Sequence, residues 1–151
     1  MRSKISIFIQ LVIGGFSALF TSQAMKMFET MNQPPLSPPA ILFPIVWTIL
    51  YLVMGIGAYL IGISDAPEEE IQKAERVYKA QLAVNFLWPT FFFHFQWYLF
   101  SFVWLLLLWV LALNMIIRFW NISKTAAKMN FPYLIWLTFA AYLNFGIYLL
   151  N

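Results

Sequence analysis

The amino-acid sequence predicts an all-α integral membrane protein, a bundle of five transmembrane helices that forms a single domain over residues 1–151. Hydrophobic residues make up 62% of the chain and charged residues only 10%, whereas soluble domains are about a quarter charged. Apolar runs of about 20 residues, the length that spans a bilayer, recur along the chain. The basic residues gather in alternate loops, as they do in membrane proteins. Because the loops between the runs are short, we expect no second domain.

Five segments are long and apolar enough to span a membrane: residues 5–24, 40–63, 78–97, 98–120 and 131–150. The third and fourth form one apolar block, which we expect to turn at the membrane interface around His94 and Gln96. The first resembles a signal peptide, because Arg2 and Lys4 precede it and small residues end it. Its apolar run exceeds the usual length of about 7–15 residues in such peptides, so we expect a retained helix, with cleavage as the alternative.

The distribution of basic residues predicts the orientation of the bundle. Lys26 stands alone on one side, whereas the other side carries Arg2, Lys4, Lys73, Arg76, Lys79, Arg118, Lys124 and Lys128. The richer side faces the cytoplasm in most membrane proteins. We therefore expect a cytoplasmic N-terminus and an external C-terminus, in a bacterial plasma or inner membrane. The net charge of +3 is small and scattered, and it indicates no nucleic-acid partner.

Several kinds of chemistry are not expected. The chain has no cysteine, and we predict no metal site and no cofactor. The acidic residues all fall in predicted loops, at Glu29, Asp65, Glu68, Glu69, Glu70 and Glu75. Without a carboxylate at membrane depth, proton- or sodium-coupled transport and paired-carboxylate catalysis are disfavoured. We expect His94, the single histidine, to be an interfacial residue.

Aromatic and amide side chains recur at helical spacing on three of the predicted spans. One stripe holds Gln81, Asn85, Trp88 or Pro89, and Phe92; another holds Trp136, Ala140, and Leu143 or Asn144; the third holds Trp47, Tyr51, and Met54 or Gly55. A ring beside a small residue leaves space, and an amide offers one oriented hydrogen bond. This pattern is typical of a pocket for a large apolar ligand. Packing between helices produces similar stripes, and periodicity does not separate the two explanations.

Three motifs in order resemble those of the TspO/MBR family, the tryptophan-rich sensory proteins or translocator proteins, also known as peripheral-type benzodiazepine receptors. They are PPAILFPIVWTILYLVMG at residues 38–55, QLAVNFLWPTFFF at 81–93 and FPYLIWLTFAAYLN at 131–144. The resemblance implies a five-helix bundle with a ligand cavity beneath the loop between helices 1 and 2. It also implies a porphyrin such as protoporphyrin IX as ligand rather than cofactor, or another large apolar molecule. Sterols and synthetic drugs bind the animal members.

The same resemblance implies a set of ligand-binding residues: Phe43, Pro44, Trp47, Tyr51, Asn85, Trp88, Pro89, Phe92, Trp136, Ala140 and Leu143. Some bacterial members degrade porphyrin in light, for which Trp47 and Trp136 would be the catalytic candidates. Family members often dimerise, and Ala58 with Gly62 forms a small-xxx-small pair suited to a homodimer. The chain departs from the family pattern at Gln33, where a basic residue is usual, and at Leu36 and Ile41, where tryptophans are usual; Pro34, between the first two, matches the pattern.

The first predicted loop contains four prolines, Pro34, Pro35, Pro38 and Pro39. Residues before proline avoid the helical conformation, so this loop is expected to be extended and stiff. A stiff loop loses less entropy when it covers a cavity, and we predict that residues 25–39 cap the outer mouth of the pocket. The leading hypothesis is a membrane receptor or sensor that binds a tetrapyrrole. The alternatives are a light-dependent porphyrin-degrading enzyme and a porphyrin or sterol transporter.

Overall fold

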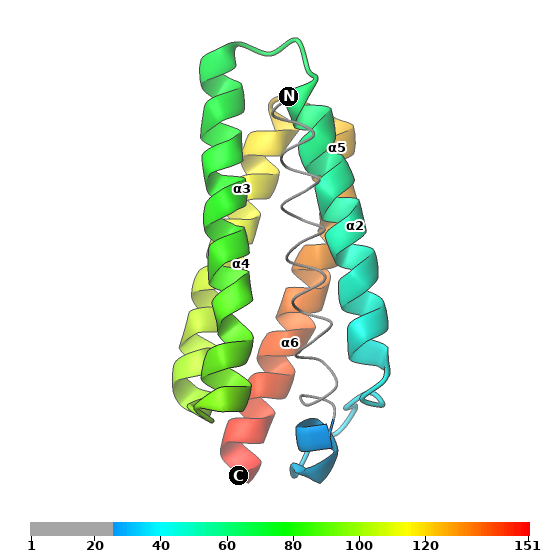
Figure 1. Cartoon of the computed structure of the whole chain (residues 1–151), viewed down its shortest axis with the longest axis vertical. Coiled ribbons are helices and arrows are strands. Elements are labelled where there is room, and N and C mark those ends of the chain that lie inside the picture. Colours follow the sequence, from blue (N-terminus) through cyan, green and yellow to red (C-terminus); the bar gives the residue numbers. More distant parts are fainter. Residues whose placement is uncertain (1–25) are drawn as a thin grey trace.

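The computed structural model describes residues 26–151, and within that range the chain is helical with no strand (Figure 1). The predicted span 5–24 lies outside the described residues. The elements are α2 (Leu42–Gly62), α3 (Glu68–Pro89), the π-helical turn η1 (Thr90–His94), α4 (Tyr98–Trp120), α5 (Lys124–Met129) and α6 (Phe131–Leu150). The α2–α3 connection and α5 lie at one end of the bundle, and the C-terminus and the segment before α2 lie at the other.

The predicted bounds of three helices are close to those observed. Helices α4 and α6 occupy residues 98–120 and 131–150 as expected, and α2 lies inside the predicted range 40–63. Their uniform apolar character makes these helices easy to find. Among the described residues, three helical stretches are long and apolar enough to cross a membrane: Leu42–Gly62, Tyr98–Trp120 and Lys124–Leu150.

The prediction for the third helix was wrong at its start, because α3 begins at Glu68 rather than at residue 78. Pro67 stands just before the helix and Glu68, Glu69 and Glu70 fill its first turn. Acidic side chains stabilise a helix N-terminus because their negative charge is attracted to the positive end of the helix dipole. The acidic residues after Pro67, which the sequence places in a loop, are therefore helical. Glu75 is also buried, with 8% of its surface exposed.

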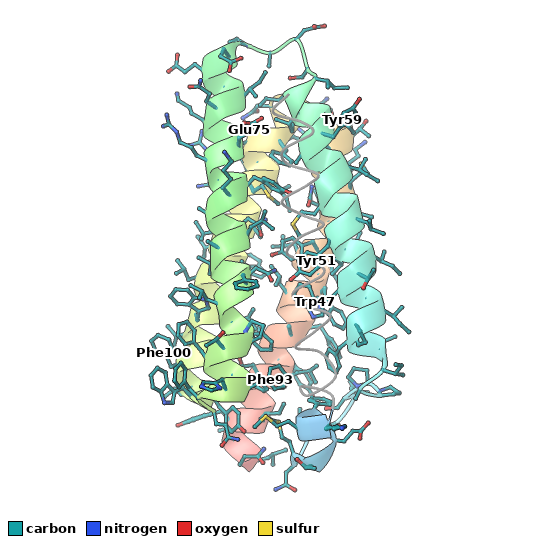
Figure 2. The ribbon with its side chains drawn as sticks, in the orientation of Figure 1. Trp47, Tyr51, Tyr59, Glu75, Phe93 and Phe100 are labelled. Carbon is teal, nitrogen blue, oxygen red and sulfur yellow. The ribbon has the colours of Figure 1, made fainter. Side chains whose placement is uncertain are left out.

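The core is formed where α2, α3, α4 and α6 meet. Fully buried side chains include Met54 on α2, Tyr78 on α3, Leu105 on α4 and Leu137 on α6. Figure 2 shows Trp47 and Tyr51 pointing from α2 towards the interior of this bundle. Ala58, expected on a dimer-forming face, is only 2% exposed in the single chain. Ala58 is therefore covered within the single chain, whereas Gly62 is partly exposed.

The proline-containing segment before α2 is held against the end of α6. The Asn32 backbone N–H donates to Asn151 Oδ1 at 3.3 Å, and Asn151 Nδ2 donates back to the Asn32 carbonyl at 2.9 Å. Nearby, the Tyr142 hydroxyl donates to the Pro35 carbonyl. The ring of Pro34 rests on Gly146, where a Cβ would lie 2.6 Å from two carbons of that ring. Gly146 thus allows a close approach that any larger residue would prevent.

This contact predicts an inverted effect for Gly146→Ala. Alanine in a helix interior is normally favoured over glycine by about 1 kcal/mol. Here the added methyl group would displace Pro34, and we expect a loss of about 1–3 kcal/mol in the free energy of unfolding. Hydrogen exchange of residues 31–41 should become faster, whereas Ile135→Ala, at an exposed position of α6, should leave it unchanged. A stabilised Gly146→Ala variant with unchanged exchange would show that this contact does not hold the segment.

Candidate ligand-binding cavity

A cavity of about 680 Å³ lies among α2, α3, α4 and α6, in the half of the bundle that contains η1 and the segment before α2. Its volume falls within the range of about 300–1,000 Å³ usual for small-molecule sites. The described residues that line it are Met27, Phe28, Phe43, Trp47, Tyr51, Asn85, Phe86, Trp88, Pro89, Thr90, Phe92, Phe93, His94, Leu105, Leu108, Trp136, Ala140, Leu143, Asn144 and Ile147. None of these is Lys, Arg, Asp or Glu.

All the predicted ligand-binding residues except Pro44 lie on this surface. Pro44, which follows Phe43 directly, is absent from the lining. The carbonyl of Pro44 instead accepts a hydrogen bond from the Thr48 hydroxyl at 2.7 Å. Three motifs distant in sequence therefore meet around one space. Their role in ligand binding stays a prediction.

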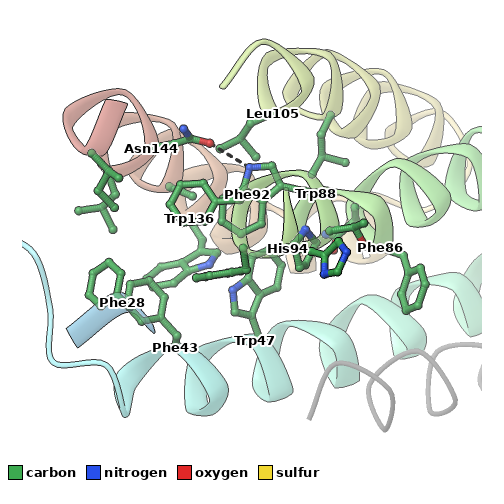
Figure 3. A pocket seen from close by; sticks show the side chains of 18 of the residues that line it. Phe28, Phe43, Trp47, Phe86, Trp88, Phe92, His94, Leu105, Trp136 and Asn144 are labelled. Atoms are coloured by element: carbon green, nitrogen blue, oxygen red, sulfur yellow. Dashed lines mark hydrogen bonds between the residues drawn. The ribbon is translucent and has the colours of Figure 1, made fainter. Parts of the chain in front are cut away.

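Helix α2 contributes a ring at each turn, at Phe43, Trp47 and Tyr51. Trp47 stacks on Tyr51 with ring centroids 5.5 Å apart, and it meets Trp136 of α6 edge to face at 6.3 Å. Phe43 also meets Trp136 edge to face, at 5.8 Å. Such arrangements are favourable beyond the apolar area that they bury. The indole of Trp136 is consequently held between two rings of α2 (Figure 3).

A buried chain of hydrogen bonds joins α2, α3 and α6 beside the cavity. The Tyr51 hydroxyl donates to Asn85 Oδ1 at 2.8 Å, and Asn85 Nδ2 donates to the Tyr133 hydroxyl at 2.7 Å. That hydroxyl in turn donates to Gln81 Oε1 at 2.7 Å, and Gln81 Nε2 contacts Met54 Sδ at 3.2 Å. Asn85 was expected to orient a ligand, yet each of its polar atoms already has a protein partner. Tyr133, in the third motif, was not singled out from the sequence.

A second polar connection joins α3, α6 and the start of α4. Trp88 Nε1 donates to Asn144 Oδ1 at 3.0 Å, the dashed line in Figure 3, and Asn144 Nδ2 donates to the Tyr98 carbonyl at 2.8 Å. The α6 stripe ends at Leu143 or Asn144, and both residues line the cavity. Asn144 therefore bridges helices, and in doing so it fixes the plane of the Trp88 ring.

The turn η1 supplies cavity residues that the sequence did not predict. Pro89 lacks the N–H that would continue the α-helical ladder, and the chain passes into a π-helical turn after it. This turn brings Thr90, Phe93 and His94 to the lining together with Phe92. His94 is exposed, as an interfacial residue would be, and also borders the cavity. The π-helical turn departs from the α-helical spacing by which the stripes were identified, so that spacing did not indicate these residues.

The predicted cap, residues 25–39, is represented in the lining by Met27 and Phe28. Phe28 meets Phe43 edge to face at 4.8 Å, which joins this segment to the first turns of α2. Pro34 and Pro35, which follow, contact α6 and do not line the cavity. The aromatic residue at position 28 is the sequence feature that makes this contact. Whether the segment closes the mouth stays a prediction.

Trp136 differs from the other tryptophans of this region. Its Nε1 atom is buried and has no hydrogen-bond partner in residues 26–151. By contrast, the indole nitrogens of Trp88, Trp104 and Trp109 donate to Asn144, to the Val84 carbonyl and to Thr138, respectively. The cavity thus contains one buried donor that is not satisfied by the protein.

A bundle of long apolar helices around a cavity lined with aromatic rings defines the chain as an integral membrane protein with an internal cavity. Comparison with known proteins specifies the family: the TspO/MBR family model matches residues 6–150, and the chain belongs to this family. It is similar to the tryptophan-rich protein TspO of Chlorobaculum tepidum, with 34% identity over 93% of this chain and 90% of the relative. The TspO of Archaeoglobus fulgidus is 35% identical over 97% and 94%. The translocator protein of Ovis aries is 33% identical over 89% and 82%.

The central position of Tyr133 in the hydrogen-bond chain predicts the effect of Tyr133→Phe. The variant keeps the ring but leaves buried amide groups of Asn85 and Gln81 without their partner. We expect the free energy of unfolding in detergent to fall by about 2 kcal/mol. Tyr59→Phe, on the exposed side of α2, is the matched control and should change it little. Equal stability of the two variants would show that the chain of bonds does not hold the helices together.

Proposed function

We propose that this protein is a membrane receptor or sensor that binds a large, flat apolar ligand, a tetrapyrrole such as protoporphyrin IX, in the cavity. The observation that carries the proposal is that Trp47, Trp88 and Trp136, from three different helices, line the same space. Flat indole rings stack on aromatic macrocycles. Relatives of the chain are named tryptophan-rich sensory proteins and translocator proteins, which supports a role in sensing or moving a small molecule.

The proposal includes a five-helix transmembrane bundle in which residues 5–24 form the remaining span. Its N-terminus would be cytoplasmic and its C-terminus external, in a bacterial plasma or inner membrane. The described basic residues support this orientation: Arg118, Lys124 and Lys128 lie around α5, at the same end of the bundle as the α2–α3 connection. Only Lys26 lies in the described segment before α2.

Two of the departures from the family pattern lie outside the cavity lining of this chain. Leu36 and Ile41 are 84% and 60% exposed, and neither contributes to the lining. Gln33 donates through Nε2 to the Phe28 carbonyl at 2.7 Å, so it helps to hold a residue that does. These substitutions are therefore compatible with binding of a tetrapyrrole.

Binding of the ligand inside the cavity is tested by a substitution that fills the cavity with a side chain. Ala140→Phe places a ring into the space, and we expect it to weaken binding of protoporphyrin IX at least about tenfold, equivalent to about 1.4 kcal/mol. A dark titration of the detergent-purified protein, followed by the Soret band and by tryptophan fluorescence, measures this. Leu149→Phe adds the same ring at a position that is 66% exposed and should bind as the wild type does. Quenching that does not saturate, or that matches empty micelles, would contradict the proposal.

Light-dependent degradation of the bound porphyrin is a second candidate function. The contact between Trp47 and Trp136, with centroids 6.3 Å apart, favours it, because two oxidisable rings would lie beside an excited macrocycle. Transport is a third hypothesis, although no inverted repeat of the kind common in transporters is present in the sequence.

Degradation predicts that the Soret band of bound porphyrin disappears in light faster than that of free porphyrin. Trp47→Phe and Trp136→Phe should slow the loss while binding in the dark persists, because phenylalanine stacks but is much harder to oxidise. A loss rate equal to that of free porphyrin, in a protein that binds saturably in the dark, would leave receptor function and exclude the enzyme.

A further inference from the structure

Two lysines of α5 lie over one tryptophan ring at the end of the bundle opposite the C-terminus (Figure 1). Lys124 Nζ is 5.5 Å and Lys128 Nζ is 5.9 Å from the centroid of the Trp120 ring. A cation within about 6 Å of an aromatic ring is attracted to the face of the ring. Both lysines are exposed, whereas the two alanines between them are fully buried. The short helix therefore packs by one side and carries two charges on its outer side.

The charges of these lysines are not balanced by acidic side chains of the described chain. Within residues 26–151, the ion pairs are those of Lys73 with two glutamates about one turn away on α3. Neither α5 lysine has an acidic partner in that range. Positions 124 and 128 are one helical turn apart, a spacing at which like charges repel each other. An anion shared by the two ammonium groups would relieve this repulsion.

An exposed apolar strip begins beside the lysines and follows the contact between α4 and α6. Trp120 stacks on Phe131 with ring centroids 6.5 Å apart, and three helical turns away Trp109 Nε1 donates to the Thr138 hydroxyl at 2.9 Å. Ile135 lies between these two contacts on the same face of α6 as Phe131. Trp120, Phe131 and Ile135, which we call the apolar strip, are 40%, 42% and 70% exposed.

The length of this surface matches the depth of one leaflet of a bilayer. From Trp120 back to Trp109, α4 rises about 16 Å at about 1.5 Å per residue, and half of a hydrocarbon core is about 15 Å thick. The helical stretches that carry the strip are both long and apolar enough to cross a membrane. The lysines stand at their ends, and long lysine side chains at such positions extend to the level of the lipid headgroups.

We propose that Lys124 and Lys128, beside Trp120, bind the phosphate of an anionic phospholipid whose acyl chain lies along the apolar strip. Two unbalanced cations require an anion, and the adjoining apolar surface of leaflet depth requires a hydrocarbon chain; an anionic lipid combines the two. A zwitterionic lipid has its own cation next to the phosphate and gains less. Trp120 and both lysines are absent from the lining of the cavity, so the inference does not depend on what the cavity binds.

Titration of the detergent-purified full chain with lipid, followed by native mass spectrometry, tests the choice of headgroup. Dioleoylphosphatidylglycerol and dioleoylphosphatidylcholine have the same acyl chains and differ in charge. We expect the wild type to bind the anionic lipid roughly 10- to 30-fold more tightly, since each lysine near an anionic lipid contributes about fivefold. Lys124→Gln with Lys128→Gln should abolish the preference. Arg76→Gln with Lys79→Gln removes the same charge from exposed positions of α3 and should keep it.

A fluorescent label on the apolar strip tests the position of the acyl chain. The chain has no cysteine, so a fluorophore can be attached to a single introduced one. Ile135→Cys places the label on the strip, and Val103→Cys places it at a 56% exposed position near the other end of α4. Phosphatidylglycerol with brominated chains should quench the label at position 135 at a lower mole fraction than brominated phosphatidylcholine does. At position 103 the two lipids should quench equally.

Each contrary outcome identifies a different occupant or a different cause. Equal affinity for the two lipids, or an equal loss of preference in the α3 double variant, would overturn the inference, because net charge would then attract the lipid. Displacement of the anionic lipid by millimolar glycerol phosphate would indicate a site for soluble anions and would also overturn it. Dimers that form without lipid and shield position 135 from quenching would assign the strip to a second copy of the chain and contradict the inference.

Discussion

The geometry of the cavity depends on the buried hydrogen bonds between two tyrosines and two amides. In an apolar interior these groups have no water to bond to, so the helices must keep the register in which they meet. Three of the four members lie about one turn from a ring of the cavity: Tyr51 follows Trp47, Asn85 precedes Trp88, and Tyr133 precedes Trp136. Because residues three or four apart share a helix face, the register of the polar groups also sets the positions of the indoles.

Space between the rings follows from a second constraint, the interruption of α3 at Pro89. The π-helical turn after Pro89 presents Phe92, Phe93 and His94 to the cavity in succession. Trp88 stacks on Phe92 at 4.9 Å and is fixed from the other side by Asn144. Rigid rings on one side and a small residue, Ala140, on α6 leave a preformed space. A preformed site binds a ligand without a large entropic cost of ordering the protein.

Much of this arrangement could be predicted from the sequence, and the remainder has identifiable reasons. Uniform hydropathy located α4 and α6, and helical spacing located the rings of α2, α3 and α6 on the cavity. Hydropathy did not detect the polar first half of α3, where acidic residues and Pro67 begin the helix. Periodicity identifies the face of a helix but not its partners, so the role of Tyr133 between Asn85 and Gln81 was not predicted. An unsatisfied donor such as Trp136 Nε1 is defined by what does not surround it, and only the three-dimensional structure shows that.

The paired and unpaired donors show which groups hold the walls of the cavity. Leaving a buried N–H unpaired costs roughly 1–3 kcal/mol in the ligand-free protein. The tyrosine–amide chain and the Trp88–Asn144 bond hold the walls at the same time, so the helices do not close around Trp136 to satisfy it. The cavity therefore keeps its shape through bonds between the helices, and one donor stays unpaired as a result.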